Sequence, residues 1–228
     1  MQYANYIKQI EIDALWNGRK HIKWQLNRDV NILSGVNGVG KTTILNKVVH
    51  LLHSNEELTD HSGNVKIDFA PEAATCVRFD VIQKYTIDPD TILQQLQDKF
   101  VQYPDAKKTT FYDLVDTLYG TTDKTILRNE REIRLLQEGD ILTFHELSSG
   151  EKQMLLIMLT VLLQDGQPTV LFMDEPEVSL HMEWQKQLID IITRLNPNVQ
   201  LILTTHSPAI IMNGWMDKVT EVSEIVVS

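Results

Sequence analysis

The stretch GVNGVGKT, residues 35–42, decides the fold of this chain. It matches the pattern G-x-x-x-x-G-K-[ST], in which glycines let backbone N–H groups converge on phosphate oxygens. The apolar residues before it, within 30–33, predict a short strand, and Ile44, Leu45 and Val48 after it are spaced as on one face of a helix. A strand, a glycine-rich turn and a helix N-terminus form an anion cradle. The sequence therefore predicts that the chain binds a nucleoside triphosphate.

Individual residues of this loop have expected roles. Lys41 would reach the β- and γ-phosphates, and Thr42 would hold Mg²⁺ through its hydroxyl. The residues expected to hold the nucleotide here are Asn37, Gly38, Val39, Gly40, Lys41, Thr42 and Thr43. The alternative is a glycine-rich turn that ends in Lys-Thr by chance, and the strand and helix on either side argue against it.

Length and charge restrict the class of protein. The 228 residues are enough for one large α/β domain, or for one domain with a helical insertion. A net charge of −10 argues against a broad nucleic-acid surface, although it does not exclude a local basic patch. No apolar run reaches the roughly 18–20 residues of a membrane span, and the first residues carry no secretory signal. A single cysteine, Cys76, allows no intramolecular disulfide and agrees with a cytoplasmic protein.

Alternating strands and helices predict an α/β fold with a mainly parallel P-loop sheet. Three strands are expected within residues 6–33, and the first two form an antiparallel hairpin through a turn at Asn17-Gly18. Buried strands are expected at 169–173 and 201–204, two further strands between 65 and 82, and a helix over about 182–195. Residues 218–227 suggest one or two edge strands.

Residues of about 90–165 are interpreted as a helical lobe inserted into the core of a single domain, 1–228. Apolar residues there fall into three sets at helical spacing, the third of which spans 126–136. Arg128, Arg131 and Arg134 would then repeat on one face of that third helix. They would form either a solvated face balanced by neighbouring glutamates or a contact with a partner or a phosphate.

Two acids follow the predicted strand at 169–173. In open parallel sheets the ligand lies beyond the carboxyl ends of the strands, so Asp174 and Glu175 would face the phosphate loop. Asp174 would bind Mg²⁺, directly or through water, and Glu175 would orient or deprotonate the attacking water. The two acids could instead cap the next helix, but the presence of a P-loop favours catalysis.

A second anion-binding feature is expected at Ser148-Ser149-Gly150, at the start of the apolar helix. A Ser-Ser-Gly turn at a helix N-terminus presents N–H groups and hydroxyls, although in isolation it is only an N-cap with Glu151 in the first turn. A single ATP does not need two such helix ends from one subunit. The second copy therefore suggests a site that is shared between subunits.

Together these motifs resemble the ATP-binding-cassette (ABC) ATPase superfamily across most of the chain. In that family a serine-glycine signature from one subunit closes over the ATP of the other, and residues 147–153 resemble it, with Ser149 for the first glycine and Glu151 for the glutamine. The Glu-Lys form of the signature and Asn37 in the phosphate loop are more similar to the RecF, SMC and OLD-type ATPases than to transporter cassettes. The resemblance implies an ABC ATPase head that binds ATP and Mg²⁺ and forms a homodimer through an ATP sandwich.

Residues 175–181, EPEVSLH, resemble the D-loop of small ATPases that are related to the OLD group and to bacterial phage-defence systems. His181 departs from the transporter pattern. It would have a structural or interfacial role, and a chemical role is the alternative.

Three further assignments come from position in the chain. His206 follows the strand at 201–204 and can donate a hydrogen bond to the γ-phosphate, and the resemblance makes it the switch histidine. The resemblance also implies that Gln83 touches Mg²⁺ and the attacking water. Trp16 could stack on the adenine base, but a partly buried tryptophan is an equal alternative.

The leading hypothesis is an ATPase that dimerises head to tail around two ATP molecules and switches a partner effector in phage defence. The effector would be a separate nuclease or toxin, because the roughly twenty residues after His206 are too few for a nuclease domain such as OLD proteins carry. A RecF-like DNA-repair or DNA-sensing ATPase, with DNA as a partner, is one alternative. A transporter nucleotide-binding subunit is another, and the D-loop argues against it.

Overall fold

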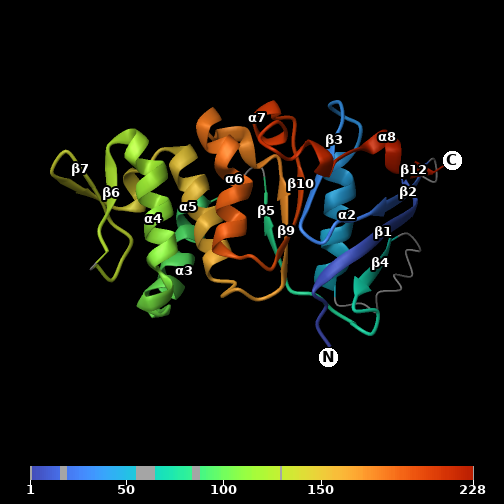
Figure 1. Ribbon diagram of the computed structural model, residues 1–228, viewed down its shortest axis with the longest axis horizontal. Helices are drawn as coiled ribbons and strands as arrows, with labels where there is room; N and C mark the ends of the chain where they lie inside the picture. The colour runs from blue at the N-terminus through green and yellow to red at the C-terminus, as the bar shows by residue number, and fades with distance from the viewer. Residues whose placement is uncertain (1, 16–19, 55–64, 84–87, 129, 228) are drawn as a thin grey trace. The chain divides into compact units, whose positions relative to one another are not determined.

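The computed structural model describes residues 2–15, 20–54, 65–83, 88–128 and 130–227 (Figure 1). The chain divides into two compact units, each of which collects segments that lie far apart in the sequence. Unit 1 comprises Met1–Lys84, Pro168–Pro176 and Asn198–Ser228, and unit 2 comprises Tyr85–Gln167 and Glu177–Pro197. The prediction of one domain over 1–228, with a lobe of about 90–165 inserted in it, stays a prediction.

The centre of unit 1 is a parallel sheet. Its strands are β3 (Val30–Ser34), β5 (Phe79–Ile82), β9 (Thr169–Asp174), β10 (Val199–Thr204) and β11 (Val219–Glu221). They lie in the order β11-β3-β10-β9-β5, and every pair of neighbours is parallel. All residues of β9 and β10 are buried, which explains their continuous apolar runs. The predicted α/β fold with a mainly parallel sheet is confirmed.

An antiparallel sheet forms the second layer of unit 1. Its strands are β1 (Tyr6–Ala14), β2 (Lys20–Gln25), β4 (Val65–Ala70) and β12 (Val226–Val227), in the order β12-β2-β1-β4. The predicted N-terminal hairpin is confirmed by the antiparallel pairing of β1 with β2. Its predicted turn at Asn17-Gly18, and Trp16 with it, lie outside the described residues.

One core joins these two sheets. Helix α2 (Lys41–Ser54) buries Ile44 and Val48 in a cluster that also contains Ile10 of the antiparallel sheet and Phe172 and Ile202 of the parallel sheet. After β11 the chain forms the short helix α8 (Val222–Ile225) and returns to the antiparallel sheet as β12. The sequence suggested one or two edge strands at 218–227, and the structure has two, β11 and β12, which belong to different sheets.

A buried amide connects the sheets directly. Gln200 of β10 has no exposed surface, and its side chain accepts a hydrogen bond from Ile7 N at 2.8 Å. Its Nε2 donates to Ile7 O at 2.8 Å and to Asn27 O at 2.7 Å. Ile7 belongs to β1, so the side chain of Gln200 supplies the peptide-like partner that the end of this strand would otherwise lack.

The described part of unit 2 is built on four helices. They are α3 (Pro89–Gln102), α4 (Thr109–Tyr119), α5 (Ser149–Leu162) and α6 (Met182–Leu195). Helix α3 begins as its sequence demands, with Pro89 in the first turn and Asp88 accepting a hydrogen bond from Thr91 N at 3.1 Å. Phe100 of α3 and Phe111 and Tyr112 of α4 pack as an aromatic cluster with ring centroids 5.2–6.1 Å apart.

Short helical turns occupy several connections. They are the 3₁₀ turns η1 (Asp105–Lys107), η2 (Gly120–Thr122), η3 (Phe144–Glu146), η4 (Pro176–Ser179) and η5 (Met216–Lys218), and the one-turn helix α7 (Pro208–Ile211).

The third predicted helix of the lobe is wrong. Residues 124–142 contain a three-stranded antiparallel sheet made of β6 (Lys124–Ile126), β7 (Leu135–Gln137) and β8 (Asp140–Leu142). Glu138 and Gly139 connect β7 to β8 with φ values of 51° and 97°, the positive values that a two-residue hairpin turn requires. This turn sets the structure of the segment and overrides the helical spacing of its apolar residues.

The arginines of this segment accordingly share no helix face. Arg128 pairs with Asp113 and Asp116 of α4, at 2.9 and 2.6 Å, and Arg134 lies 3.3 Å from Glu132. These contacts agree with the interpretation of the arginines as charges balanced by nearby acids.

Candidate functional site

The phosphate loop lies between β3 and α2 in unit 1, as the sequence predicts. Gly38 and Gly40 have φ values of 80° and 104°, a region that side-chain-bearing residues rarely adopt, so the path of the loop depends on glycine there. Asn37 and Gly38 are exposed, Val39 and Gly40 are half-buried, and Thr42 and Thr43 are exposed at the first turn of α2. The loop therefore presents its backbone and the helix N-terminus to solvent, as an anion cradle must.

Lys41 is buried at the start of α2 and bends back over the loop. Its Nζ donates to Gly35 O at 2.9 Å and to Val36 O at 3.4 Å, and lies 2.5 Å from His206 Nε2. His206 follows β10, the strand next to β3, and its side chain is 35% exposed. The two groups that the sequence assigns to the γ-phosphate are thus neighbours in the fold.

Thr42 and Asp174 form a second pair. The hydroxyl of Thr42 donates to the carboxylate of Asp174, with distances of 2.9 and 3.1 Å to its two oxygens. Thr204, the last residue of β10, donates its hydroxyl to Asp174 Oδ1 at 2.6 Å and fixes the carboxylate from the other side. Asp174 is 8% exposed and is held by two hydroxyls, so its orientation is set before any ligand binds.

Glu175 has an unusual backbone. Its φ is +43°, in the left-handed region, and its N–H donates to both the carbonyl and the hydroxyl oxygen of Thr204, each at 3.1 Å. The result is a sharp turn after β9 that places Glu175 Oε1 3.5 Å from His206 Nε2. Strained backbone of this kind persists where neighbouring structure imposes it, often at functional sites.

Gln83 lies at the same edge of the sheet. It is exposed directly after β5, whose last residue, Ile82, pairs with Met173 of β9, one residue before Asp174. The parallel sheet therefore brings the ends of β3, β5, β9 and β10 to one edge, together with the predicted residues that follow them.

The donor set of Thr42 and Asp174 fits a magnesium ion. Mg²⁺ prefers oxygen ligands and is bound in nucleotide sites through one or two protein oxygens together with phosphates and water. A hydroxyl and a carboxylate already in contact are such a pair.

The signature residues lie in unit 2, at the start of α5. Ser148 is the N-cap, and it forms a reciprocal capping box with Glu151. Ser148 and Ser149 are exposed, so the serines that the sequence predicts to contact a phosphate are accessible. Gly150 has a steric reason for lacking a side chain, because a Cβ there would lie 2.4 Å from the carbonyl oxygen of Ser179. The signature turn and the D-loop are therefore in close backbone contact.

His181 caps helix α6. Its Nδ1 accepts a hydrogen bond from Glu183 N at 3.4 Å, and the residue is exposed. A cavity of about 440 Å³ lies beside it, lined among others by Ser149, Gly150 and Trp184. The capping contact agrees with the structural role that the sequence favours, and the interfacial role stays a prediction.

Two residues of these sites were missed by sequence reasoning. Thr204 could have been found, because a polar residue that ends a buried strand next to the acid-bearing strand is placed to support the site. Lys124 could not, because its partner Glu151 lies 27 residues away and nothing local signals the pair.

Within the described parts of the chain, no helix is both long enough and apolar enough to cross a bilayer.

Comparison with known sequences places the chain among P-loop ATPases. It is 24% identical to the Septu protein PtuA of Bacillus thuringiensis, over 89% of this chain and 72% of that protein. It is 28% identical to the Retron Ec83 probable ATPase of Escherichia coli, over 56% of this chain, but it spans only 26% of that relative.

A solved structure has the same fold. The SMC head bound to the C-winged helix domain of ScpA superposes with a TM-score of 0.65 at 12% identity, covering 91% of this chain and 92% of that one. A family profile described as "AAA domain, putative AbiEii toxin, Type IV TA system" matches residues 98–213, half of the chain. The chain belongs to this family of P-loop ATPase domains.

Proposed function

We propose that two copies of this ATPase close around two molecules of ATP, so that Ser148, Ser149 and Gly150 of one copy complete the phosphate site of the other. The observation that carries the proposal is the convergence of Lys41, His206 and Glu175 at one end of the parallel sheet. There His206 Nε2 lies 2.5 Å from Lys41 Nζ and 3.5 Å from Glu175 Oε1. The signature is a second accessible helix start in a different unit of the chain. Because a single ATP does not need two such helix ends from one subunit, a second phosphate-type motif favours assembly between copies.

In this proposal each residue has a defined task. Lys41 exchanges its contacts with the carbonyls of the loop for contacts with the β- and γ-phosphates. Thr42 and Asp174 hold Mg²⁺, which neutralises phosphate charge when it is bound. Glu175 accepts a proton from the attacking water, or orients that water, and His206 donates a hydrogen bond to the γ-phosphate. Gln83 would contact Mg²⁺ and the attacking water, and residues 37–43 would surround the phosphates.

Closure provides a switch because ATP contacts both copies only in the dimer. Hydrolysis removes those contacts and shifts the population towards open monomers. The partner that responds is proposed to be a separate effector, a nuclease or toxin. Relatives named for a Septu and a retron system support a role in bacterial defence.

The substitution Glu175→Gln tests the catalytic part of the proposal. It keeps the shape of the side chain and removes the base, so we expect turnover to fall on the order of 10²–10⁴-fold. ATP binding should be kept, and an ATP-bound dimer should accumulate in the presence of Mg²⁺ but not of a chelator. Phosphate release and light scattering after size exclusion measure the two effects.

Lys41→Ala is the matched control, since it removes the phosphate contact and should give monomers with or without ATP. If Glu175→Gln hydrolyses ATP at the wild-type rate, Glu175 is not the base. If it stays monomeric with ATP and Mg²⁺, the shared site is wrong.

A further inference from the structure

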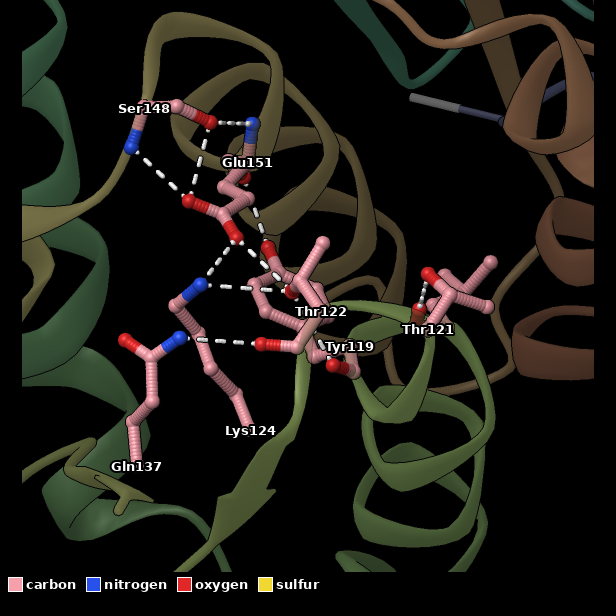
Figure 2. A network of polar contacts seen from close by, with 8 residues as sticks. Tyr119, Thr121, Thr122, Lys124, Gln137, Ser148 and Glu151 are labelled. Atoms are coloured by element: carbon pink, nitrogen blue, oxygen red, sulfur yellow. Dashed lines mark hydrogen bonds and ion pairs between the residues drawn. The ribbon is translucent and has the colours of Figure 1, made fainter.

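A buried ion pair lies directly beneath the signature turn (Figure 2). Lys124 Nζ of β6 is 2.8 Å from Glu151 Oε1 of α5, and the two side chains are only 10% and 7% exposed. Thr122 bonds to both, donating to Glu151 Oε1 at 3.1 Å and accepting from Lys124 Nζ at 3.2 Å. Gln137 of β7 donates to Thr122 O at 3.0 Å and so connects the β6–β8 sheet to the same network.

The other carboxylate oxygen of Glu151 holds Ser148. It accepts from Ser148 N at 2.8 Å and from Ser148 Oγ at 2.9 Å, and Glu151 N bonds back to Ser148 Oγ at 3.4 Å. Tyr119 of α4 fixes the same turn by donating to Glu151 O at 2.6 Å. Every polar group of Glu151 is therefore used to set the position of the first turn of α5.

The charge of Glu151 is a problem for a phosphate site. Burial raises the pKa of Glu151, but the hydrogen bonds from Lys124 and Ser148 outweigh this effect and hold the pKa below its usual value, so the carboxylate is ionised. An anion in the first turn of a helix opposes the approach of a second anion to that helix end. A glutamine, which a capping box also accepts at this position, would form the same cap without the charge.

We propose that Lys124 is a positioning residue of the signature, which neutralises Glu151 so that the first turn of α5 can accept the phosphate of a second copy's ATP. The Lys124–Glu151 pair thus does with two charged side chains what a single neutral glutamine would do. This inference rests on the shared ATP site of the proposed function. It means that a residue of β6, which lies outside the phosphate-binding motifs, controls the affinity of that site for ATP.

The test measures the ATP concentration needed for dimerisation, in a Glu175→Gln background that prevents turnover. Lys124→Met should raise the half-maximal ATP concentration by at least about tenfold. Without Lys124, the buried carboxylate of Glu151 would repel phosphate and would no longer hold the first turn of α5 in place. Nucleotide binding by dilute monomers, followed with a fluorescent ATP analogue, should stay within about twofold of the parent, because unit 1 is unaffected.

A double variant distinguishes the loss of charge neutralisation from a general loss of structure. In Lys124→Met/Glu151→Gln both charges are absent and the cap is kept, so dimerisation should return to within about threefold of the parent. Lys107→Met is the matched control, since it removes an exposed pair of the same unit, Lys107 with Asp165 at 2.5 Å, and should leave dimerisation unchanged. Thermal unfolding confirms that each variant is folded.

The outcomes are distinct. Parent-like dimerisation by folded Lys124→Met would overturn this inference alone. If Lys124→Met does not fold, the double variant decides, and a folded double variant that dimerises poorly also overturns it. If the parent itself forms no ATP-dependent dimer, the proposed function fails, and this inference fails with it.

Discussion

At the scale of the residue, the signature glycine leaves no room for a side chain. A Cβ on Gly150 would lie 2.4 Å from Ser179 O, and that atom is backbone, so it cannot move aside without displacing the D-loop. Gly120 has room for a side chain, because a Cβ added there would meet no atom within 4 Å. Its φ of −58° also suits any residue. These two glycines of unit 2 therefore make a matched pair.

We expect Gly150→Ala to lower the free energy of unfolding by on the order of 1–3 kcal/mol, as overpacking does, and to weaken ATP-dependent dimerisation. Gly120→Ala should change the free energy of unfolding by less than about 0.5 kcal/mol and leave dimerisation as it is. Urea denaturation and light scattering measure both variants. Equal behaviour of the two would show that the D-loop contact does not restrict position 150.

At the scale of the element, strands and helices with one dominant signal were predictable. The P-loop, the two buried strands β9 and β10, and helix α6 follow the sequence patterns closely, because burial on both faces or along one stripe leaves a clear apolar period. The segment 124–142 was not predictable from that period, since its structure depends on a two-residue turn at Glu138-Gly139. Short strands that pair only with each other carry too few apolar positions to show alternation.

The amide of Gln200 offers a prediction at this scale. Gln200→Leu leaves Ile7 N, Ile7 O and Asn27 O without this partner, so the free energy of unfolding should fall by on the order of 3 kcal/mol. Gln25→Leu, at an exposed position of β2, is the control and should stay within about 0.5 kcal/mol. Urea denaturation distinguishes them, and an unchanged midpoint for Gln200→Leu would mean that the amide does not hold the sheets together.

At the scale of the whole molecule, the sequence allowed us to predict that the site residues lie close together, because a parallel sheet brings the ends of its strands to one edge. The ends of β3, β9 and β10 lie at one edge, so residues of widely separated segments, such as Thr42, Asp174 and Thr204, meet in unit 1. The support of the signature by Lys124 could not be predicted, since a buried ion pair between a strand and a helix leaves no periodic trace in the sequence.

The proposed effector should distinguish the nucleotide states of the ATPase. Tagged Glu175→Gln, held closed by ATP, and Lys41→Ala, held open, would be purified from the native host. We expect one protein, identified by mass spectrometry, to be enriched with one of the two variants, because a switch requires different affinity for its two states. The same co-purifying proteins in equal amounts with both variants, or none, would contradict the proposal.

The left-handed turn at Glu175 has an evolutionary consequence. A φ of +43° favours glycine or asparagine, so selection for the fold alone would push this position away from glutamate. In the proposed function, the need for a carboxylate at this position keeps glutamate there. In a lineage that no longer hydrolyses ATP, we therefore expect this codon to drift early and in a definite direction, so that asparagine or glycine at this position marks a degenerate enzyme.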